Sequence, residues 1–528
     1  MNLLAKRATA RMTAWAVCSL LLAATAGDAQ VDEPADTFSA AIEVELLDLQ
    51  VIVTDADGER VHDLPASAFR ILVDGEETPI QLFAEVREGG GTADAAAEAN
   101  PKAATEADIP STPRIPVNYL VFIDDLMTLE RNRDFVLERL RDDLELLRPG
   151  DRMAVVRLDR KRKLQILSDW TSHTDILDQA LRQAMELPAW GIKYIALRRM
   201  TNYVANWEGN DTRRSVLAAA GSLRLLERPP GRRALLLVAS SWDPVELDRS
   251  DGFSPWCVTW PCERTGVYDV LTDTANLYGY AIYAVDVEGR DPDQNWGREK
   301  RLHAVLGELA RVTGGKRLLN GGRRRMLQMA VEDTSSYYSI AVTPPPGAPE
   351  LRMAVDIEML RQGLEARSQT AFVPLSAQRD RELDILAALW LEEGAQQSPL
   401  GLRLDHVERL SGGRMHIAGH LLLPAGLLQW RSDGDRTYAE VTVEVASVDW
   451  RGDSSAVAER RMILYRLGGE ETMQMVLPWP LELRRRRHTI VAGLRDHLGG
   501  HSYTAVAEIA PRDPPRRAGL DLAKLEQP

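Results

Sequence analysis

The hydrophobic pattern of the chain alternates between short continuous runs and longer segments with helical spacing. Almost unbroken apolar runs occur at residues 117–123, 234–239 and 280–285. Runs of this length are typical of strands that are buried on both faces of a sheet. Apolar residues between them recur every three or four positions, which predicts helices over 134–148, 174–187 and 301–312. This alternation predicts an α/β fold with a doubly wound, mainly parallel sheet.

Further strands are predicted inside and outside this α/β region. Residues 152–158 and 164–167 predict two strands within it, and residues 337–342 predict its closing strand. Upstream, residues 41–54 alternate between apolar and polar positions, and two Asp-Gly turns follow, which indicates an N-terminal β module. Beyond residue 374, short strands are separated by Gly, Asp and Pro, which is typical of a β-sandwich.

The N-terminus has the pattern of a secretory signal peptide. Basic residues precede an apolar core over 12–26, and small residues follow it. This core is shorter than the roughly 20 apolar residues that a membrane span needs. We therefore expect a secreted or periplasmic protein with no membrane span after cleavage. The expected segments are a signal peptide (1–29), an N-terminal β module (38–87), a flexible linker (88–113), the α/β domain (114–345), trailing strands (346–375), a β-sandwich-like domain (376–512) and a tail (513–528).

The net charge bears on the kind of partner, and the cysteines bear on disulfide bonding. The formal net charge of −14 argues against a nucleic-acid partner, and the arginine runs 323–325 and 484–487 are interpreted as solvated faces. Cys257 and Cys262 lie close together on a chain that we expect to be exported, so they predict one disulfide bond. Trp242, Trp256 and Trp260 crowd the same segment. They indicate either a recognition surface or a hydrophobic cluster beneath a long loop, and the sequence leaves both open.

The order of these elements resembles the VWFA-related domain family of secreted bacterial proteins, which is built on the von Willebrand factor A fold. The similarity includes the paired glycines 314–315 after a helix, the paired tyrosines 337–338 in a strand and the N-terminal β module. The resemblance implies a divalent-metal site at an Asp-x-Ser-x-Ser motif after the first buried strand. Here the motif reads Asp124-x-Leu126-x-Thr128, so a hydrocarbon replaces one hydroxyl ligand. The later carboxylate is displaced to Asp243.

Ligands of an open α/β sheet bind at the carboxyl ends of its strands. The candidate ligand-binding edge therefore consists of Asp124, Asp125, Thr128, Ser240, Ser241 and Asp243. Within this set, the resemblance implies Asp124, Thr128 and Asp243 as the residues that would hold Mg²⁺. The nearest candidate for a further threonine ligand is Thr201, which lies in the long segment 194–226 that favours a helix. We expect no bound metal, because each lost ligand lowers the affinity of such a site.

No motif for catalysis is visible in the sequence. It lacks the Gly-x-Ser-x-Gly elbow, the His-Glu-x-x-His zinc motif and a phosphate-binding glycine loop. Two histidine pairs, His416 with His420 and His497 with His501, are spaced by four residues without a carboxylate cluster. Such histidines are more often surface or core groups than ligands.

The sequence thus predicts an exported, non-catalytic protein of adhesion or scaffold type. It would bind another protein at the carboxyl edge of the α/β sheet, without a metal. One alternative is magnesium-dependent binding at the divergent site. Another is a hydrolase that uses the C-terminal histidines.

Overall fold

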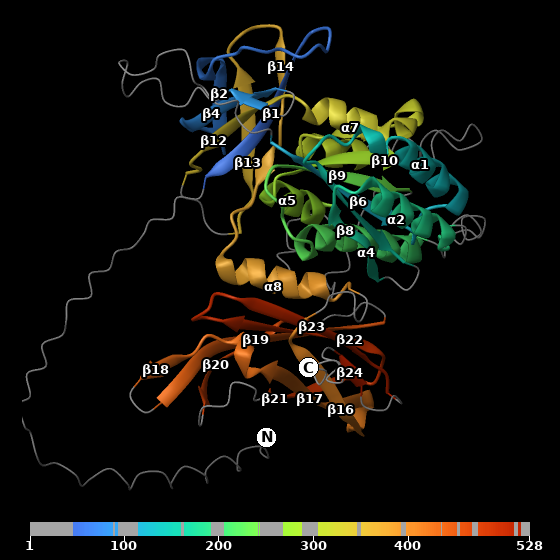
Figure 1. Ribbon diagram of the computed structural model, residues 1–528, viewed down its shortest axis with the longest axis vertical. Helices are drawn as coiled ribbons and strands as arrows, with labels where there is room; N and C mark the ends of the chain where they lie inside the picture. The colour runs from blue at the N-terminus through green and yellow to red at the C-terminus, as the bar shows by residue number, and fades with distance from the viewer. Residues whose placement is uncertain are drawn as a thin grey trace, which may run out of the picture. The chain divides into compact units, whose positions relative to one another are not determined.

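The computed structural model describes fourteen parts of the chain (Figure 1). They are residues 46–87, 90–92, 115–159, 163–191, 205–240, 242, 268–287, 305–345, 350–391, 398–433, 436–450, 455–466, 474–511 and 516–518. The predicted signal peptide lies outside them, as does most of the predicted linker and tail. Within these parts, no helix combines the length and the hydrophobicity that crossing a membrane requires.

A six-stranded sheet forms the centre of the α/β domain, as the sequence predicts. Its order is β11-β10-β9-β6-β7-β8, and every neighbouring pair is parallel except β7 and β8. The strands are β6 (Val117–Asp124), β7 (Arg152–Leu158), β8 (Leu164–Thr171), β9 (Arg232–Ala239), β10 (Tyr280–Asp286) and β11 (Lys316–Leu318). The predicted fold class, a mainly parallel α/β sheet flanked by antiparallel β structure, is confirmed.

Helices cover both faces of this sheet, which explains why its strands are apolar throughout. In β6, Leu120 and Phe122 pack on one side, whereas Tyr119 and Val121 pack on the other. The first side is covered by α4 (Ala205–Leu225), α5 (Asp269–Leu277) and the helical residues 305–312. The second side is covered by α1 (Glu130–Asp142), α2 (Thr174–Glu186) and α7 (Met326–Thr334). Each fully buried Leu or Phe contributes roughly 1.5–3 kcal/mol to folding.

The predicted closing strand does not belong to the parallel sheet. This strand, β12 (Tyr337–Val342), pairs antiparallel with β1 (Leu47–Asp55) and β4 (Ile80–Arg87). The sequence-based assignment of residues 337–342 is therefore wrong in its partner, because an apolar strand of six residues fits the core of either sheet. The α/β domain is inserted into a β domain that the N-terminal module and the trailing strands build together.

Two antiparallel sheets form this β domain around one core. The first has the order β14-β1-β12-β4-β5 and the second β15-β13-β2-β3. The remaining strands are β2 (Phe69–Val73), β3 (Glu76–Glu77), β5 (Gly90–Thr92), β13 (Met353–Met359), β14 (Leu364–Arg367) and β15 (Ala371–Phe372). Strand β5 falls within the predicted linker, so the regular structure extends beyond residue 87.

A buried carboxylate joins the inserted domain to the β domain. Asp333, in α7, accepts hydrogen bonds from Arg60 and Arg367 of the β domain and from Tyr283 of β10, each at 2.7 Å. Lys316 of β11 lies 2.7 Å from the same carboxylate. The Asp333 side chain is fully buried. Its three cationic partners compensate for the loss of hydration that burial imposes on its charge.

Helix α8 (Ala377–Ala388) was not predicted from the sequence. Its N-cap is Ser376, whose hydroxyl accepts a hydrogen bond from the Arg379 backbone N–H at 3.1 Å. One side of α8 packs on α4, and another packs on strands of the C-terminal domain. Because both sides are covered, its apolar residues do not form the single stripe by which an amphipathic helix is recognised in a sequence.

The C-terminal domain is a sandwich of two antiparallel sheets around one core, consistent with the predicted β-sandwich. One sheet has the order β21-β17-β16-β24, and the other contains β18, β19, β22 and β23, with β20 paired to β19. The strands are β16 (Gly401–Arg409), β17 (Arg414–Pro424), β18 (Arg431–Asp433), β19 (Arg436–Asp449), β20 (Ala458–Arg466), β21 (Gln474–Arg484), β22 (His488–Asp496), β23 (Ser502–Ile509) and β24 (Arg516–Ala518).

Candidate functional site

The candidate site begins at Asp124, the last residue of β6, whose buried side chain accepts a hydrogen bond from the protein at each oxygen. The indole N–H of Trp242 donates to Asp124 Oδ2 at 2.8 Å, and the backbone N–H of Met127 donates to Oδ1 at 3.2 Å. Trp242 follows β9, the parallel neighbour of β6. Its ring stacks on Tyr268 with a centroid distance of 6.3 Å. An indole therefore lies against the carboxylate that the resemblance implies as a metal ligand.

Burial raises the pKa of Asp124 to about 7, although Trp242, Ser215 and the Met127 N–H favour the charged form. Desolvation dominates because the carboxyl is fully enclosed. The group thus changes its charge near neutral pH. A carboxyl group binds a divalent cation only in its deprotonated form, so protonation of Asp124 below this range would compete with a metal ion.

The loop after β6 uses its hydroxyl groups to hold backbone atoms. Thr128 donates from its hydroxyl to the carbonyl oxygen of Asp124, and Ser240 donates to the carbonyl oxygen of Met127 at 3.0 Å. Leu126 and Met127 are buried in the core beneath them. Asp124, Asp125 and Thr128 are fully buried, and Ser240 is 2% exposed. None of the four reaches the surface in this conformation.

Asp125 lies in a separate buried ion cluster. Its Oδ1 is 2.7 Å from Nη1 of Arg133, and its Oδ2 is 2.7 Å from Nε of Arg157. Burial raises the pKa of Asp125 to about 6, and the two guanidinium groups oppose that shift. The carboxylate is therefore charged at neutral pH, and its charge is matched by two arginines, one from α1 and one from β7.

The loop after α2 closes over this cluster. The Trp190 N–H donates to the Asp125 carbonyl oxygen at 2.7 Å, and the Gly191 N–H donates to the Thr128 carbonyl oxygen at 2.9 Å. Arg133 also donates to the carbonyl oxygen of Leu187 at 2.9 Å. A Cβ at Gly191 would lie 2.4 Å from the carbonyl carbon of Thr128, so this contact requires glycine. Two loops that are distant in sequence are thus locked together over the end of the sheet.

These described residues do not fit a magnesium site. Both oxygens of Asp124 accept hydrogen bonds from the protein, and the Thr128 hydroxyl is bonded to backbone. Within the described parts of the chain, no three His, Cys, Asp or Glu residues are grouped so that they could hold a metal ion. Thr201, Ser241, Asp243, Cys257 and Cys262 lie outside these parts. The roles proposed for them, including the disulfide bond, remain predictions.

The C-terminal histidines have structural contacts. His420 Nδ1 lies 2.8 Å from Asp405 Oδ2 on the neighbouring strand, and His497 Nε2 lies 2.8 Å from the Thr442 hydroxyl. The ring of His501 packs at an angle against that of Tyr503, with centroids 6.5 Å apart. His416, on β17, pairs in register with Glu408 and Glu482. Among these contacts, a histidine meets a hydroxyl group only in the His497–Thr442 pair.

The residues that close the site were not predicted from the sequence. The sequence left open whether Trp242, Trp256 and Trp260 form a recognition surface or a hydrophobic cluster. Trp242 is 2% exposed, so its ring belongs to the core, whereas Trp256 and Trp260 lie outside the described residues. Arg133 carried no signal, because an arginine on a helix is usually exposed. One clue does lie in the sequence: Arg157 falls within an otherwise apolar strand, where a charge needs a buried partner.

No protein family model and no curated protein matches the chain. Matching solved structures include the vWF domain of the type V pili tip protein Mfa5 from Porphyromonas gingivalis, at 20% identity over 24% of this chain and 38% of that chain, with a TM-score of 0.17. Human COPII-coat protein Sec24c matches at 11% identity over 50% of this chain and 44% of that chain, with a TM-score of 0.23. The pilus adhesin SpaC from Lactobacillus rhamnosus GG matches at 8% identity over 75% of this chain and 54% of that chain, with a TM-score of 0.27.

The chain therefore spans between 38% and 54% of the length of these three structures. A vWF domain is among the matches. The fold assignment itself rests on the order and direction of the six strands described above.

Proposed function

We propose that this chain is an exported, non-catalytic protein of adhesion or scaffold type that binds another protein at the carboxyl edge of its α/β sheet. Binding would not depend on a metal. The observation that carries the proposal is the hydrogen bond from the Trp242 indole to Asp124, which is fully buried. This contact replaces an ion with a side chain of the same protein, and it leaves the edge as a preformed surface.

The buried hydrogen bonds and ion pairs of Asp124 and Asp125 favour a rigid binding surface over a catalytic site at this edge of the sheet. Asp124 and Asp125 are enclosed, so a substrate has no access to the two carboxylates with raised pKa values at this edge. The solvent-exposed part of this edge consists of loop residues and helix ends. Trp190 is 36% exposed directly above the Asp125 cluster, and Glu130 is exposed at the start of α1. Tryptophan is among the residues enriched at the centre of protein interfaces. The proposal also assigns the loop that contains Cys257 and Cys262 to this binding edge, because it follows β9 in the sequence.

Site-specific photo-crosslinking tests the location of the interface. A photoreactive amino acid is placed at Trp190 or at Glu130, both on the carboxyl edge, and at exposed Arg152 on the opposite edge as a matched control. We expect the same partner to be crosslinked from both edge positions, equally with EDTA and with Mg²⁺, and not from Arg152. Crosslinks only from Arg152, or crosslinks that EDTA abolishes, would refute the proposal.

A further inference from the structure

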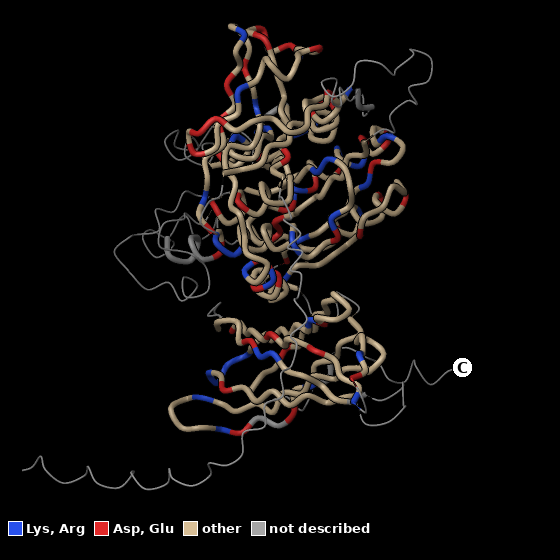
Figure 2. Tube along the Cα trace, turned by 90° about the vertical axis from the view of Figure 1, so that its left-hand side faces the viewer, with Lys and Arg blue, Asp and Glu red and all other residues tan. Residues whose placement is uncertain are grey.

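The segment from Leu309 to Val331 has an unusual charge. It contains six basic residues and no acidic residue, in a chain whose formal net charge is −14. Acidic residues just beyond its two ends pair with three of the six, namely Glu308 with Arg311, Glu332 with Arg325 and Asp333 with Lys316. Acidic and basic residues are otherwise interspersed along the described trace (Figure 2). The basic residues are Arg311, Lys316, Arg317, Arg323, Arg324 and Arg325. A local excess of one sign attracts groups of the opposite sign and accelerates their association.

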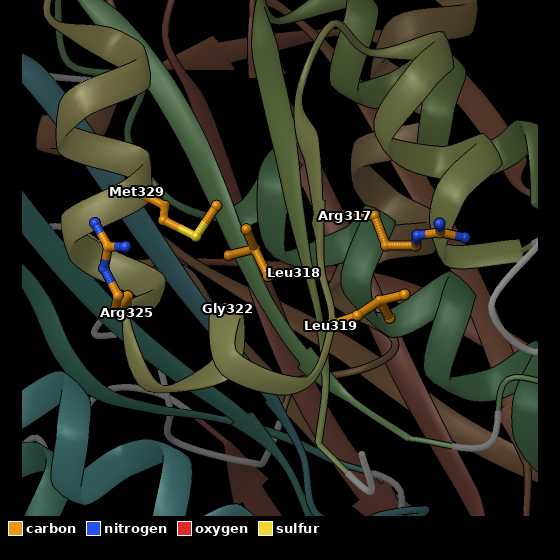
Figure 3. Close-up of a pocket in the computed structure, with 6 residues that line it drawn as sticks. All are labelled: Arg317, Leu318, Leu319, Gly322, Arg325 and Met329. Carbon is orange, nitrogen blue, oxygen red and sulfur yellow. The ribbon is translucent and has the colours of Figure 1, made fainter. Parts of the chain in front are cut away.

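Part of this segment surrounds a hollow with an apolar floor. The cavity has a volume of about 400 Å³ and is lined by Arg317, Leu318, Leu319, Gly322, Arg325 and Met329 (Figure 3). In Figure 3, the Met329 side chain, from α7, extends toward Leu318, from β11. Arg317 and Arg325 are both exposed. In Figure 3 the Arg317 side chain extends away from Leu318 and Met329, whereas Arg325 lies on their side. We call this surface, from Arg317 to Met329, the arginine hollow.

Neighbouring contacts hold the arginines of this surface in place. The guanidinium groups of Arg323 and Arg324 each lie 5.2 Å from the ring centroid of Phe135, on α1. Arg323 also donates to the carbonyl oxygen of Val287 at 3.2 Å. Arg325 contacts Glu332 at 3.4 Å through an exposed pair, which water screens strongly. Side chains ordered in this way lose less conformational entropy when they bind a ligand.

The arginine hollow lies on the same edge of the sheet as the closed site. Its first residues end β11, the edge strand that runs parallel to β10. The N-terminus of α7 follows Arg325 and adds the partial positive charge of its free N–H groups. The edge therefore combines a closed centre at Asp124 with a positive, partly apolar surface to one side.

We propose that the arginine hollow binds an acidic segment of a partner protein, with carboxylates against the arginines and one apolar side chain in the hollow. This inference rests on the proposed protein-binding function and names the chemistry of the partner. An apolar floor of this volume fits a side chain such as Leu or Met, for which a phosphate backbone offers no counterpart. The overall negative charge also repels long polyanions, so selectivity has to come from local contacts.

Fluorescence anisotropy with three labelled decapeptides tests the chemistry on the full chain. The first peptide contains Asp and Glu around one central Leu. The second replaces that Leu with Ser, and the third replaces the acidic residues with Lys. We expect the first peptide to bind, the second to bind about tenfold more weakly because the hollow stays unfilled, and the third not to bind. Absence of binding by the first peptide, or equal binding of the first two, would overturn the proposal.

Two double variants locate the binding. Arg324→Glu with Arg325→Glu changes the arginine hollow, whereas Arg484→Glu with Arg485→Glu removes the same charge from the arginine run of the C-terminal domain. We expect the first to weaken the acidic Leu peptide about tenfold or more and the second to change its affinity less than about twofold. An equal loss of peptide affinity in both variants would show nonspecific electrostatic attraction and would contradict the proposal.

Phosphatidylglycerol vesicles test the competing possibility that the arginine hollow binds an anionic membrane. Binding of vesicles but not peptide, lost in the Arg324 and Arg325 variant, would assign the surface to a membrane and contradict the proposal. Photo-crosslinking at Trp190 is independent of these measurements. Failure of the peptide assay with persistent crosslinks would therefore reject the acidic partner alone, whereas loss of both would reject the protein-binding function too.

Discussion

Replacing Asp124 with Asn should remove a pH-dependent loss of stability from the α/β domain. Burial raises the pKa of Asp124 to about 7 in the folded protein, above its ordinary value of 3.8. The folded state therefore keeps a proton that the unfolded chain releases, so the free energy of unfolding falls as the pH rises from about 4 to about 7. Above pH 7 both states are ionised at this group, and its contribution becomes constant.

The shift sets the size of this effect. One pKa unit corresponds to about 1.4 kcal/mol, so a shift of about three units costs about 4 kcal/mol in full. Between pH 5 and pH 8 the wild-type protein should lose about 3 kcal/mol through Asp124, because part of the loss has already occurred at pH 5. Asn has no proton to release in this range. The stability of Asp124→Asn relative to wild type should thus rise by about 3 kcal/mol over the same interval.

Urea unfolding is measured at pH 5 and pH 8 through the hydrogen exchange of the peptide that spans β6. The measured free energy of unfolding is then that of the α/β domain. Asp125, whose pKa is also raised by burial, remains in both proteins, so its contribution largely cancels in the comparison. Asp142→Asn, at an exposed position on α1, serves as the matched control and should follow wild type at both pH values. A constant difference between Asp124→Asn and wild type across this range would show that Asp124 does not titrate there.

Three further substitutions test the contacts around the site and the domain junction. Trp242→Phe removes the indole donor from Asp124 and should cost about 1–3 kcal/mol in urea unfolding, whereas an unchanged midpoint would show that the bond is dispensable. Gly191→Ala forces a Cβ against Thr128 and should cost about 1–3 kcal/mol by the same measurement; wild-type stability would contradict the close approach. Burial alone would raise the pKa of Asp333, but Arg367 and Lys316 hold it well below its ordinary value, so its stabilisation is present above about pH 4 and is lost in stronger acid. Asp333→Asn should therefore cost about 3–5 kcal/mol at pH 7 in calorimetric unfolding and distinctly less at pH 2, and an equal cost at both pH values would count against the ion cluster.

The parallel sheet was predictable because its strands are buried on both faces. Strands β6, β9 and β10 are continuous apolar runs, as expected of parallel strands that helices cover on both sides. The partner of β12 was not predictable. Its hydrophobicity indicates a core strand but does not indicate which core, and its pairing with β1 spans almost 300 residues of sequence, since Leu47 is opposite Val342.

The candidate site was predictable only in part. A carboxylate at the end of β6 follows from the sequence, as does the loss of a hydroxyl at Leu126. The partners of that carboxylate do not, because Trp242 comes from the loop after another strand. The same holds for Asp125, whose two arginines come from separate elements. Long-range pairing of polar groups leaves no periodic signal in one sequence.

Calorimetric titration of the full chain with Mg²⁺ and Mn²⁺ decides whether protein groups, and not a cation, satisfy the carboxylate at the rim of the sheet. We expect no heat beyond dilution at millimolar metal, and identical traces for wild type and Asp124→Asn. Stoichiometric binding that Asp124→Asn abolishes would contradict a metal-independent edge, because the cation would then have displaced the Trp242 indole from the carboxylate.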